Sequence, residues 1–289
     1  MATLQSGPSS TPPPPLVEYK GNCHCGTFIF SFTAPQITKA NTCDCSICIK
    51  NGYIWSRTEE GSFTVLKGDE DALVGYVFGQ KLLVHKFCPT CGTSVIARMQ
   101  GPDLSANHGI SVLVNLRAIS EDCNLNVKSL PPGIRWNTSK VGTPYQHPPH
   151  VDFPTADATA LVYHGSCHCG AVRFAVQLDT KISTAKECNC SICWRDGSLW
   201  IYPPTERITW SGRPESVTEY TFRLHKTFHG FCKHCGIALY ERFLLEHMQI
   251  KTALNVRTLE EIESIMQDTE FTIEQGNGKG VQPLYVVPS

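Results

Sequence analysis

The sequence has almost no net charge and no long hydrophobic run, and both absences exclude classes of function. Its 25 lysines and arginines nearly balance 26 acidic residues, so the formal net charge is −1 and the pI is near 6.8. A protein that binds nucleic acid or an anionic membrane through its main surface needs a basic face, so we expect neither partner. No apolar run approaches the ~18 residues that a membrane-spanning helix requires.

The first residues of the sequence also lack the features of a targeting segment. They contain no charged segment with an apolar core, as a secretory signal does, and no arginine, as a mitochondrial transit peptide does. Their run of prolines predicts a disordered, proline-rich tail over residues 1–16. We therefore expect the protein in a reducing compartment, the cytoplasm or also the nucleus.

Cysteine, by contrast, is abundant, with fifteen residues. In a reducing compartment, closely spaced cysteines bind metal or take part in catalysis rather than forming disulfides. Three cysteine motifs occur twice: GNCHCG at 21–26 and GSCHCG at 165–170, CDCSIC at 43–48 and CNCSIC at 188–193, FCPTCG at 87–92 and FCKHCG at 231–236. We interpret this pattern as a tandem duplication. Only Cys123 lies outside the repeated motifs, and we expect it to be an inert thiol.

The spacing of the motifs is too long for a solenoid and predicts two domains. We expect a first domain over residues 17–143 and a second over 161–284. The segment 144–160 is rich in proline and small residues and predicts a linker.

The local sequence pattern predicts mainly β structure. Short alternating or β-branched segments recur between glycines and prolines, and they are typical of small, mostly antiparallel sheets. Few helices are expected. The clearest candidate covers residues 258–267, with Thr258 as its N-cap and apolar residues at helical spacing.

Two of the motifs together provide four cysteines for one metal ion. In a strand, the two cysteines of CHC point to the same side, and CxxC followed by glycine forms a tight turn that directs two thiolates to one point. A closed tetrahedral shell of four thiolates is typical of structural zinc. The ligands are Cys23, Cys25, Cys88 and Cys91 in the first half, and Cys167, Cys169, Cys232 and Cys235 in the second. The alternative, a redox-active CPTC, is disfavoured because the second half has CKHC and no thioredoxin-like context.

The third motif, CxCxxC, provides three thiolates and no fourth ligand. Three protein ligands and an open position are the pattern of catalytic zinc, so we expect two zinc ions per domain and about four per chain. The open position suits a small-molecule thiol, which would lose its proton there and become a nucleophile. Alternatively, a nearby side chain completes the shell and the site is structural. The ligands are Cys43, Cys45 and Cys48, and Cys188, Cys190 and Cys193.

Four repeated histidines are candidates for roles near these metals. His85 and His229 each stand three residues before the FCxxCG cysteine, and they are candidates for proton transfer or for contact with a metal ligand. The alternative for both is a packing role. His24 and His168 lie between paired cysteines, so we expect them to point away from the metal and to contact its ligands from outside or lie at the surface.

The order GxCHCG, CxCSIC and FCxxCG resembles the glutathione-dependent formaldehyde-activating enzymes and their relative, centromere protein V, to which residues 220–236 are especially similar. The resemblance implies a compact fold of stacked small β-sheets, a β-tent, in each domain. It also implies a closed four-cysteine zinc and an open three-cysteine zinc at the residues given above. The implied activity is addition of the glutathione thiol to formaldehyde, which in reverse is a carbon–sulfur lyase reaction.

A different class of function is also open: a non-catalytic, zinc-stabilised binding or scaffold protein. A zinc nucleobase deaminase is excluded because the sequence has no HxE motif. The two CxCxxC motifs are followed by IKNG and WRDG, so the surroundings of the two open sites differ. We expect Lys50 and Arg195 there to be solvated charges, with binding of a glutathione carboxylate as the alternative. Trp55 and Trp200 are expected in the core, or alternatively in a pocket wall.

Overall fold

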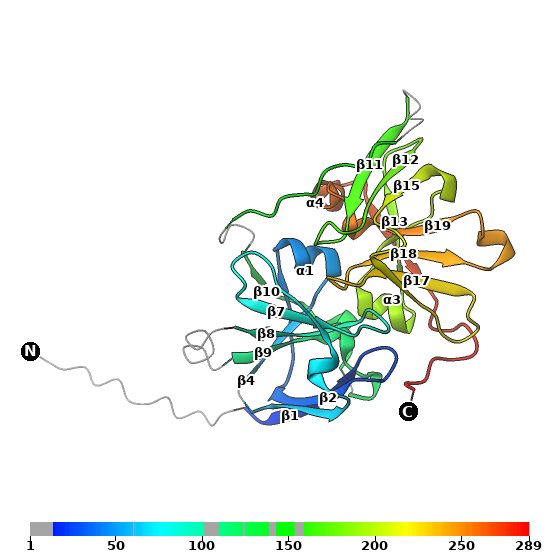
Figure 1. The fold of residues 1–289 in the computed structure, drawn as a ribbon. Helices are drawn as coiled ribbons and strands as arrows, with labels where there is room; N and C mark the ends of the chain where they lie inside the picture. Colours follow the sequence, from blue (N-terminus) through cyan, green and yellow to red (C-terminus); the bar gives the residue numbers. More distant parts are fainter. Residues whose placement is uncertain are drawn as a thin grey trace, which may run out of the picture.

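The computed structural model describes residues 14–59, 61–100, 110–123, 125–138, 143–153 and 159–288. The chain forms two units in tandem, each with a three-stranded and a seven-stranded β-sheet (Figure 1). The described residues contain three α-helices of six residues each. The predicted mainly β fold with few short helices is confirmed. Of the predicted tail over residues 1–16, residues 1–13 lie outside the described residues.

The strands of the two units correspond one to one, and helix α1 corresponds to α3. The first unit contains β1 (Leu16–Asn22), β2 (Ile29–Pro35), β3 (Ala40–Cys43), α1 (Ser46–Asn51), β4 (Trp55–Glu59), β5 (Phe63–Lys67), β6 (Val74–Tyr76), β7 (Leu83–Phe87), β8 (Ser94–Met99), β9 (Ile110–Asn115) and β10 (Pro132–Trp136). The second contains β11 (Leu161–Ser166), β12 (Arg173–Leu178), β13 (Thr184–Cys188), α3 (Ser191–Asp196), β14 (Trp200–Ile201), β15 (Ile208–Ser211), β16 (Val217–Tyr220), β17 (Thr227–Cys232), β18 (Ala238–Phe243), β19 (Thr252–Asn255), α4 (Ile262–Gln267) and β20 (Thr272–Gly276).

The order of the strands is the same in both units. The seven-stranded sheet β10-β3-β4-β9-β8-β7-β6 reappears as β20-β13-β14-β19-β18-β17-β16, and β1-β2-β5 reappears as β11-β12-β15. Neighbouring strands are antiparallel except for the edge pairs β10–β3 and β13–β20, which are parallel. The duplication that the cysteines indicate therefore extends to every strand.

The helix expected over residues 258–267 begins later than predicted. Residues Val256–Thr258 form a 3₁₀ turn, and α4 begins at Ile262. Thr258 is fully buried, and its hydroxyl donates to the carbonyl of Asn255 at 2.6 Å instead of capping the helix. Its own carbonyl accepts a hydrogen bond from Lys50 of the first unit, so a tertiary contact overrides the local helical pattern here.

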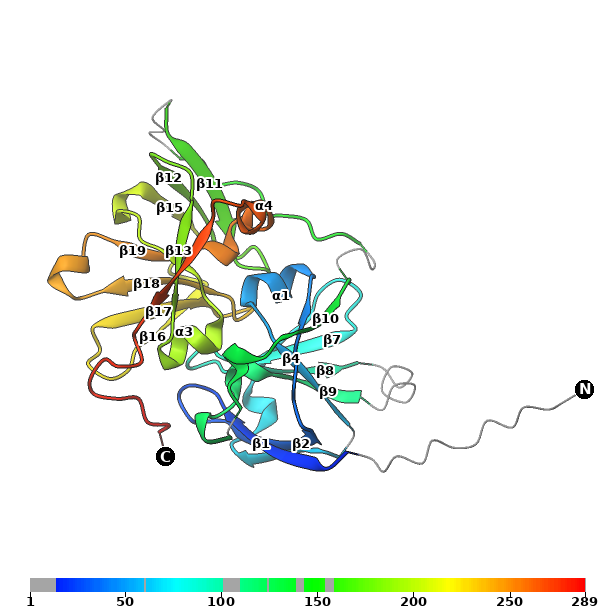
Figure 2. The ribbon, with the colours of Figure 1, turned by 180° about the vertical axis from the view of Figure 1, so that it is seen from behind.

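The two units share a continuous core. Ile47 of α1 belongs to a buried cluster that contains Phe174 and Leu254 of the second unit. Reciprocally, Trp194 of α3 packs against the buried cluster of the first unit around Phe30. Both helices lie between the units when the molecule is seen from the front and from behind (Figures 1 and 2). No helix in the described parts of the chain is long and apolar enough to span a membrane.

Candidate metal centres and the cavity between the units

Four cysteines of the first unit converge where β1 ends and where β7 meets β8. The Sγ atom of Cys25 lies 3.6 Å from that of Cys23 and 3.5 Å from that of Cys88. All four sulfur atoms, including that of Cys91, lie within 4.8 Å of one another. Sulfur atoms at about 2.3 Å from a tetrahedral zinc ion lie about 3.8 Å apart, so the four thiols fit such an ion.

The second unit repeats this cluster with Cys167, Cys169, Cys232 and Cys235. In both units the CHC pair lies in the turn after the strand, not within the strand as expected, but the turn still brings the two sulfur atoms together. The CxxC turns have the predicted form, because Gly92 and Gly236 close them with φ of 76° and 75°. Burial raises the pKa of Cys91 and Cys235 well above the usual value, so four thiolates can coexist there only around a cation.

The cysteines of the CxCxxC motif converge in the first unit at the start of α1. Cys43 ends β3, Cys45 is the N-cap of α1 and Cys48 lies within the helix. Their sulfur atoms lie within 4.8 Å of one another, which suits three ligands of one metal ion. The hydroxyl of Thr138 lies 2.8 Å from Cys43 Sγ, and the indole N–H of Trp55 donates to Cys48 Sγ at 3.4 Å.

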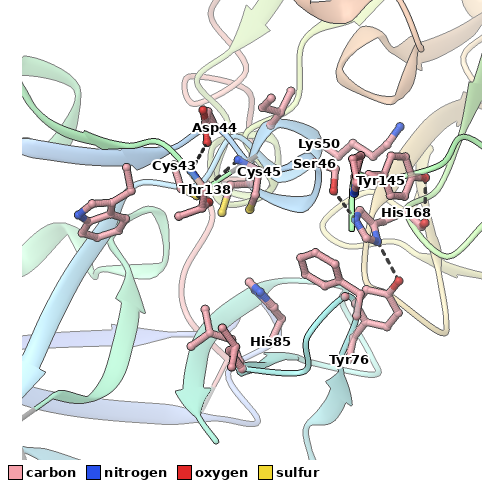
Figure 3. A pocket seen from close by; sticks show the side chains of 18 of the residues that line it. Cys43, Asp44, Cys45, Ser46, Lys50, Tyr76, His85, Thr138, Tyr145 and His168 are labelled. Carbon is pink, nitrogen blue, oxygen red and sulfur yellow. Dashed lines mark hydrogen bonds between the residues drawn. The ribbon is translucent and has the colours of Figure 1, made fainter. Parts of the chain in front are cut away.

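This three-cysteine cluster opens on a cavity of about 1130 Å³ between the two units. Cys43, Cys45 and Cys48 form part of its wall, together with Trp55 and His85. In Figure 3 the imidazole of His85 and the cysteine sulfur atoms lie on facing sides of the cavity. The second unit contributes residues to the wall from its CHC turn, from the segment before α4 and from the start of α4. Those residues are His168, Cys169, Leu259, Glu260, Ile262 and Glu263.

The equivalent cluster of the second unit has an additional acidic neighbour. Cys188, Cys190 and Cys193 converge at the start of α3, within the same limit of 4.8 Å. Here Cys193 Sγ lies 3.0 Å from Oε1 of Glu241. Glu241 was not predicted as a site residue, although aligning the two repeats would have shown it, because its counterpart in the first unit is Ala97.

The repeated histidines before the FCxxCG motifs both lie beside a three-cysteine cluster. His85 is buried among Tyr53, Trp55 and Phe78, and burial lowers its pKa to about 4. His229 is buried as well, and its Nδ1 lies 3.1 Å from Oε1 of Glu241. Their structural surroundings therefore differ, although their positions in the fold are equivalent.

The histidines between the paired cysteines connect the two units. His168 of the second unit contacts the hydroxyls of Ser46 and Tyr76 of the first unit, both at 2.8 Å (Figure 3). His24 makes the equivalent contacts with Ser191 at 2.8 Å and Tyr220 at 3.0 Å. Both imidazoles are buried, so the expectation of a surface position is wrong, and their ring nitrogens contact hydroxyls of the opposite unit.

Lys50 and Arg195 were expected to be solvated charges, and this expectation is wrong. Both are buried cations at the contact between the units. Lys50 Nζ donates to the carbonyls of Ser166 and Thr258 at 3.2 and 3.0 Å. Arg195 Nε donates to the carbonyl of Asn22 at 3.3 Å. A sequence pattern cannot show this burial, because the partner carbonyls come from the other repeat.

The αL glycines that end α1 and α3 allow the two helices to meet. Gly52 has φ of 55° and Gly197 has φ of 62°, the left-handed conformation that favours glycine at the end of a helix. A Cβ atom on Gly197 would lie 2.5 Å from the carbonyl oxygen of Asn51. Arg117 Nη1 donates across to the carbonyl of Trp194 at 3.2 Å, and Arg257 Nη1 donates across to that of Ile49 at 3.5 Å. Such reciprocal contacts are those of a symmetric dimer, here made within one chain.

The segment that follows each unit crosses to the other one. Tyr145, within the predicted linker, donates to the carbonyl of His168 at 2.9 Å and packs its ring against the imidazole. Near the C-terminus, Tyr285 makes the same two contacts with His24. Each segment thus holds the CHC turn of the opposite unit in place.

A family model and a solved structure are similar to parts of this chain. The family model of the glutathione-dependent formaldehyde-activating enzyme matches residues 18–124 and 162–279, the greater part of the chain. A solved crystal structure of a Rhodobacter sphaeroides protein is similar at 27% identity over 39% of this chain and 98% of that chain, with a TM-score of 0.34. The chain therefore belongs to the family of glutathione-dependent formaldehyde-activating enzymes, as a member with two copies of the family's domain.

Proposed function

We propose that the protein is a zinc-dependent enzyme that adds a small thiol, glutathione, to an aldehyde such as formaldehyde and catalyses the reverse carbon–sulfur cleavage. The observation that carries this proposal is the cavity of about 1130 Å³, whose wall contains the thiols of Cys43, Cys45 and Cys48. Binding sites for small molecules typically enclose about 300–1,000 Å³, so a tripeptide and an aldehyde fit together. Family membership supports the same chemistry. All fifteen cysteines are free thiols, as the reducing cytoplasm would keep them.

The proposed reaction is balanced without an oxidant or reductant. The sulfur of glutathione forms a bond to the aldehyde carbon, and the π electron pair of the carbonyl moves to its oxygen. The proton that the thiol releases ends on that oxygen, which gives S-hydroxymethylglutathione. A zinc ion held by the three thiolates would offer a fourth position to the substrate thiol and lower its pKa.

The contacts to the cysteines prepare this centre. The indole N–H of Trp55 donates to Cys48 Sγ, and the hydroxyl of Thr138 lies beside Cys43 Sγ. Hydrogen bonds of this kind orient the thiolates and reduce their electron donation, as contacts to metal ligands generally do. Cys43 and Cys45 are only half-buried, so a substrate thiol can reach them from the cavity.

His85 is the proposed proton carrier. Burial lowers its pKa to about 4, so the imidazole is neutral near pH 7, and the negative charge of Cys43 raises this pKa and makes the imidazole a better proton acceptor. Its Nδ1 atom has no hydrogen-bond partner among the described residues, and the side chain lines the cavity with the cysteines. In the proposed step, His85 takes the proton from the thiol and returns it to the aldehyde oxygen.

The cavity wall also carries charges of both signs, as a zwitterionic tripeptide requires. The guanidinium of Arg57 stacks over Trp136 at 4.7 Å, which leaves its N–H groups available for a carboxylate of glutathione. The carboxylate of Glu263 comes from the second unit and suits the ammonium group, and Glu260 beside it already contacts Nε2 of His150 at 3.0 Å. The proposed binding mode therefore uses both units for one substrate.

The test measures by NMR the rate of exchange between formaldehyde and S-hydroxymethylglutathione. The addition also proceeds without a catalyst, so the rate with the protein is compared with the uncatalysed rate. We expect exchange faster than the uncatalysed rate, and His85→Gln should lower the enzymatic part by about 10²–10⁴-fold without loss of metal. Cys45→Ser should abolish it while the far-UV circular dichroism stays native. An uncatalysed rate with the wild-type protein, or full turnover with Cys45→Ser, would contradict the proposal and favour the scaffold function.

A further inference from the structure

The two three-cysteine clusters differ at one position that faces the metal ligands. Across β7 and β8, His85 pairs with Ala97, and across β17 and β18 the equivalent His229 pairs with Glu241. Oε1 of Glu241 lies 3.0 Å from Cys193 Sγ, whereas a methyl group at position 97 offers no ligand. The second cluster thus has a fourth donor beside its thiols, and Ala97 cannot provide the equivalent donor in the first.

The two units also differ at a second buried position. The first unit has the large Tyr53 five residues after its last CxCxxC cysteine, and the second unit has Ser198 there. Tyr53 packs on Trp55 in a tilted arrangement with 4.2 Å between the ring centroids. Tyr53 and Ala97 belong to one buried hydrophobic cluster, whereas the equivalent positions of the second unit hold the polar residues Ser198 and Glu241.

The second cluster is also covered where the first is open. Cys190 is 8% exposed, whereas its counterpart Cys45 is only half-buried. The backbone of Gly278 packs directly on the cluster, since a Cβ atom there would lie 2.6 Å from Cys188 Sγ. Aromatic side chains pack around the buried cysteines of this cluster. They are Tyr202, Tyr220, Phe222 and Phe243.

Once a metal ion replaces the proton of Cys193, whose thiol donates to Oε1 of Glu241 at 3.0 Å, the carboxylate lies beside a thiolate. In a buried site, two negative charges about 3 Å apart repel each other strongly unless a positive ion lies between them. Around zinc, sulfur at about 2.3 Å and carboxylate oxygen at about 2.1 Å lie about 3.6 Å apart. A small movement of Glu241 would therefore place its oxygen in the fourth position. His229, 3.1 Å from the same oxygen, would hold the carboxylate in that orientation.

We propose that the two three-cysteine centres have different roles: Glu241 completes the metal shell of the second centre, which is closed and structural, and only the first centre binds the substrate thiol. This inference rests on the proposed function for the first centre. It gives one glutathione site per chain, although the motif occurs twice.

The experiment uses the full-length protein loaded with cadmium, whose NMR resonance reports the ligands of each centre separately. With glutathione added, we expect one resonance of the wild-type protein to move. Glu241→Ala should open the second centre, so that two resonances respond. Glu241→Gln keeps the shape of the side chain and weakens it as a ligand, so one resonance should shift even before glutathione is added. Circular dichroism checks that the variants fold.

Glu219→Gln is the matched control, because Glu219 lies on β16 and pairs with Arg242 rather than with cysteine. We expect its cadmium spectrum to match that of the wild type. Two responding resonances in the wild-type protein, or an unchanged spectrum of folded Glu241→Gln, would overturn the inference. If no wild-type resonance responds to glutathione, the proposed function fails, and the Glu241→Gln spectrum still decides whether Glu241 is a ligand.

Discussion

Replacing Cys88 with serine is expected to unfold the first unit. Cys88 belongs to a four-cysteine cluster that joins the turn after β1 to the turn between β7 and β8, and its side chain is fully buried. Structural zinc bound by such clusters contributes about 10–16 kcal/mol in small zinc domains. The free energy of unfolding of a whole domain is only about 5–15 kcal/mol, so the binding free energy lost with this ion is as large as the whole stability of the domain or larger.

The assay combines metal analysis with thermal unfolding followed by circular dichroism. We expect Cys88→Ser to lose the metal of its cluster and the cooperative transition of the first unit. Cys123→Ser is the matched control, since Cys123 belongs to none of the cysteine clusters and its thiol exchanges hydrogen bonds with the backbone of Lys20 and contacts Asp122. It should keep the metal content and stay within about 0.5 kcal/mol of the wild-type stability. A cooperative, wild-type transition of Cys88→Ser would refute the reasoning.

Two further predictions concern hydrogen bonds. The first bond is made by Trp55 and is absent at its counterpart Trp200, and the second set, made by Arg117, includes a bond between the units. Trp55→Phe removes the N–H that donates to Cys48 Sγ, and should weaken metal binding at that centre by about 10–100-fold in a chelator competition. Trp200→Phe should have no such effect, because the indole N–H of Trp200 has no partner among the described residues. Arg117→Ala removes charged hydrogen bonds to Gly52 and to α3, and should lower the free energy of unfolding by about 2–4 kcal/mol in urea titration. An unchanged urea midpoint would show that these bonds add nothing to the contact between the units.

The repeated cysteines made much of the fold and of the metal centres predictable. A short motif such as CxxCG needs a tight turn with an αL glycine wherever it directs two thiolates to one ion, and Gly92 has that conformation. Because all three motifs repeat with nearly the same spacing, the sequence also predicted two equivalent units. The short alternating apolar segments then predicted that both units are mainly β.

The contacts between the units could not be predicted, because they join residues far apart in the sequence. Lys50 looks like a solvated charge in a local sequence, and only the carbonyls of the second unit explain its burial. The same holds for His24, whose partners lie in the other repeat. Glu241 could not be predicted for a different reason. Its distance in sequence from the cysteines matches no metal-ligand motif, and only the pairing of β17 with β18 brings it beside Cys193.

The reciprocal packing of the two units bears on how such a protein can change over generations. In a dimer of identical chains, one gene encodes both halves, so every substitution appears at two symmetric places. Joining the halves in one chain removes this constraint, and position 97 can hold alanine while position 241 holds glutamate. The inherited symmetry keeps the two halves packed together, and the fusion lets selection act on each half alone.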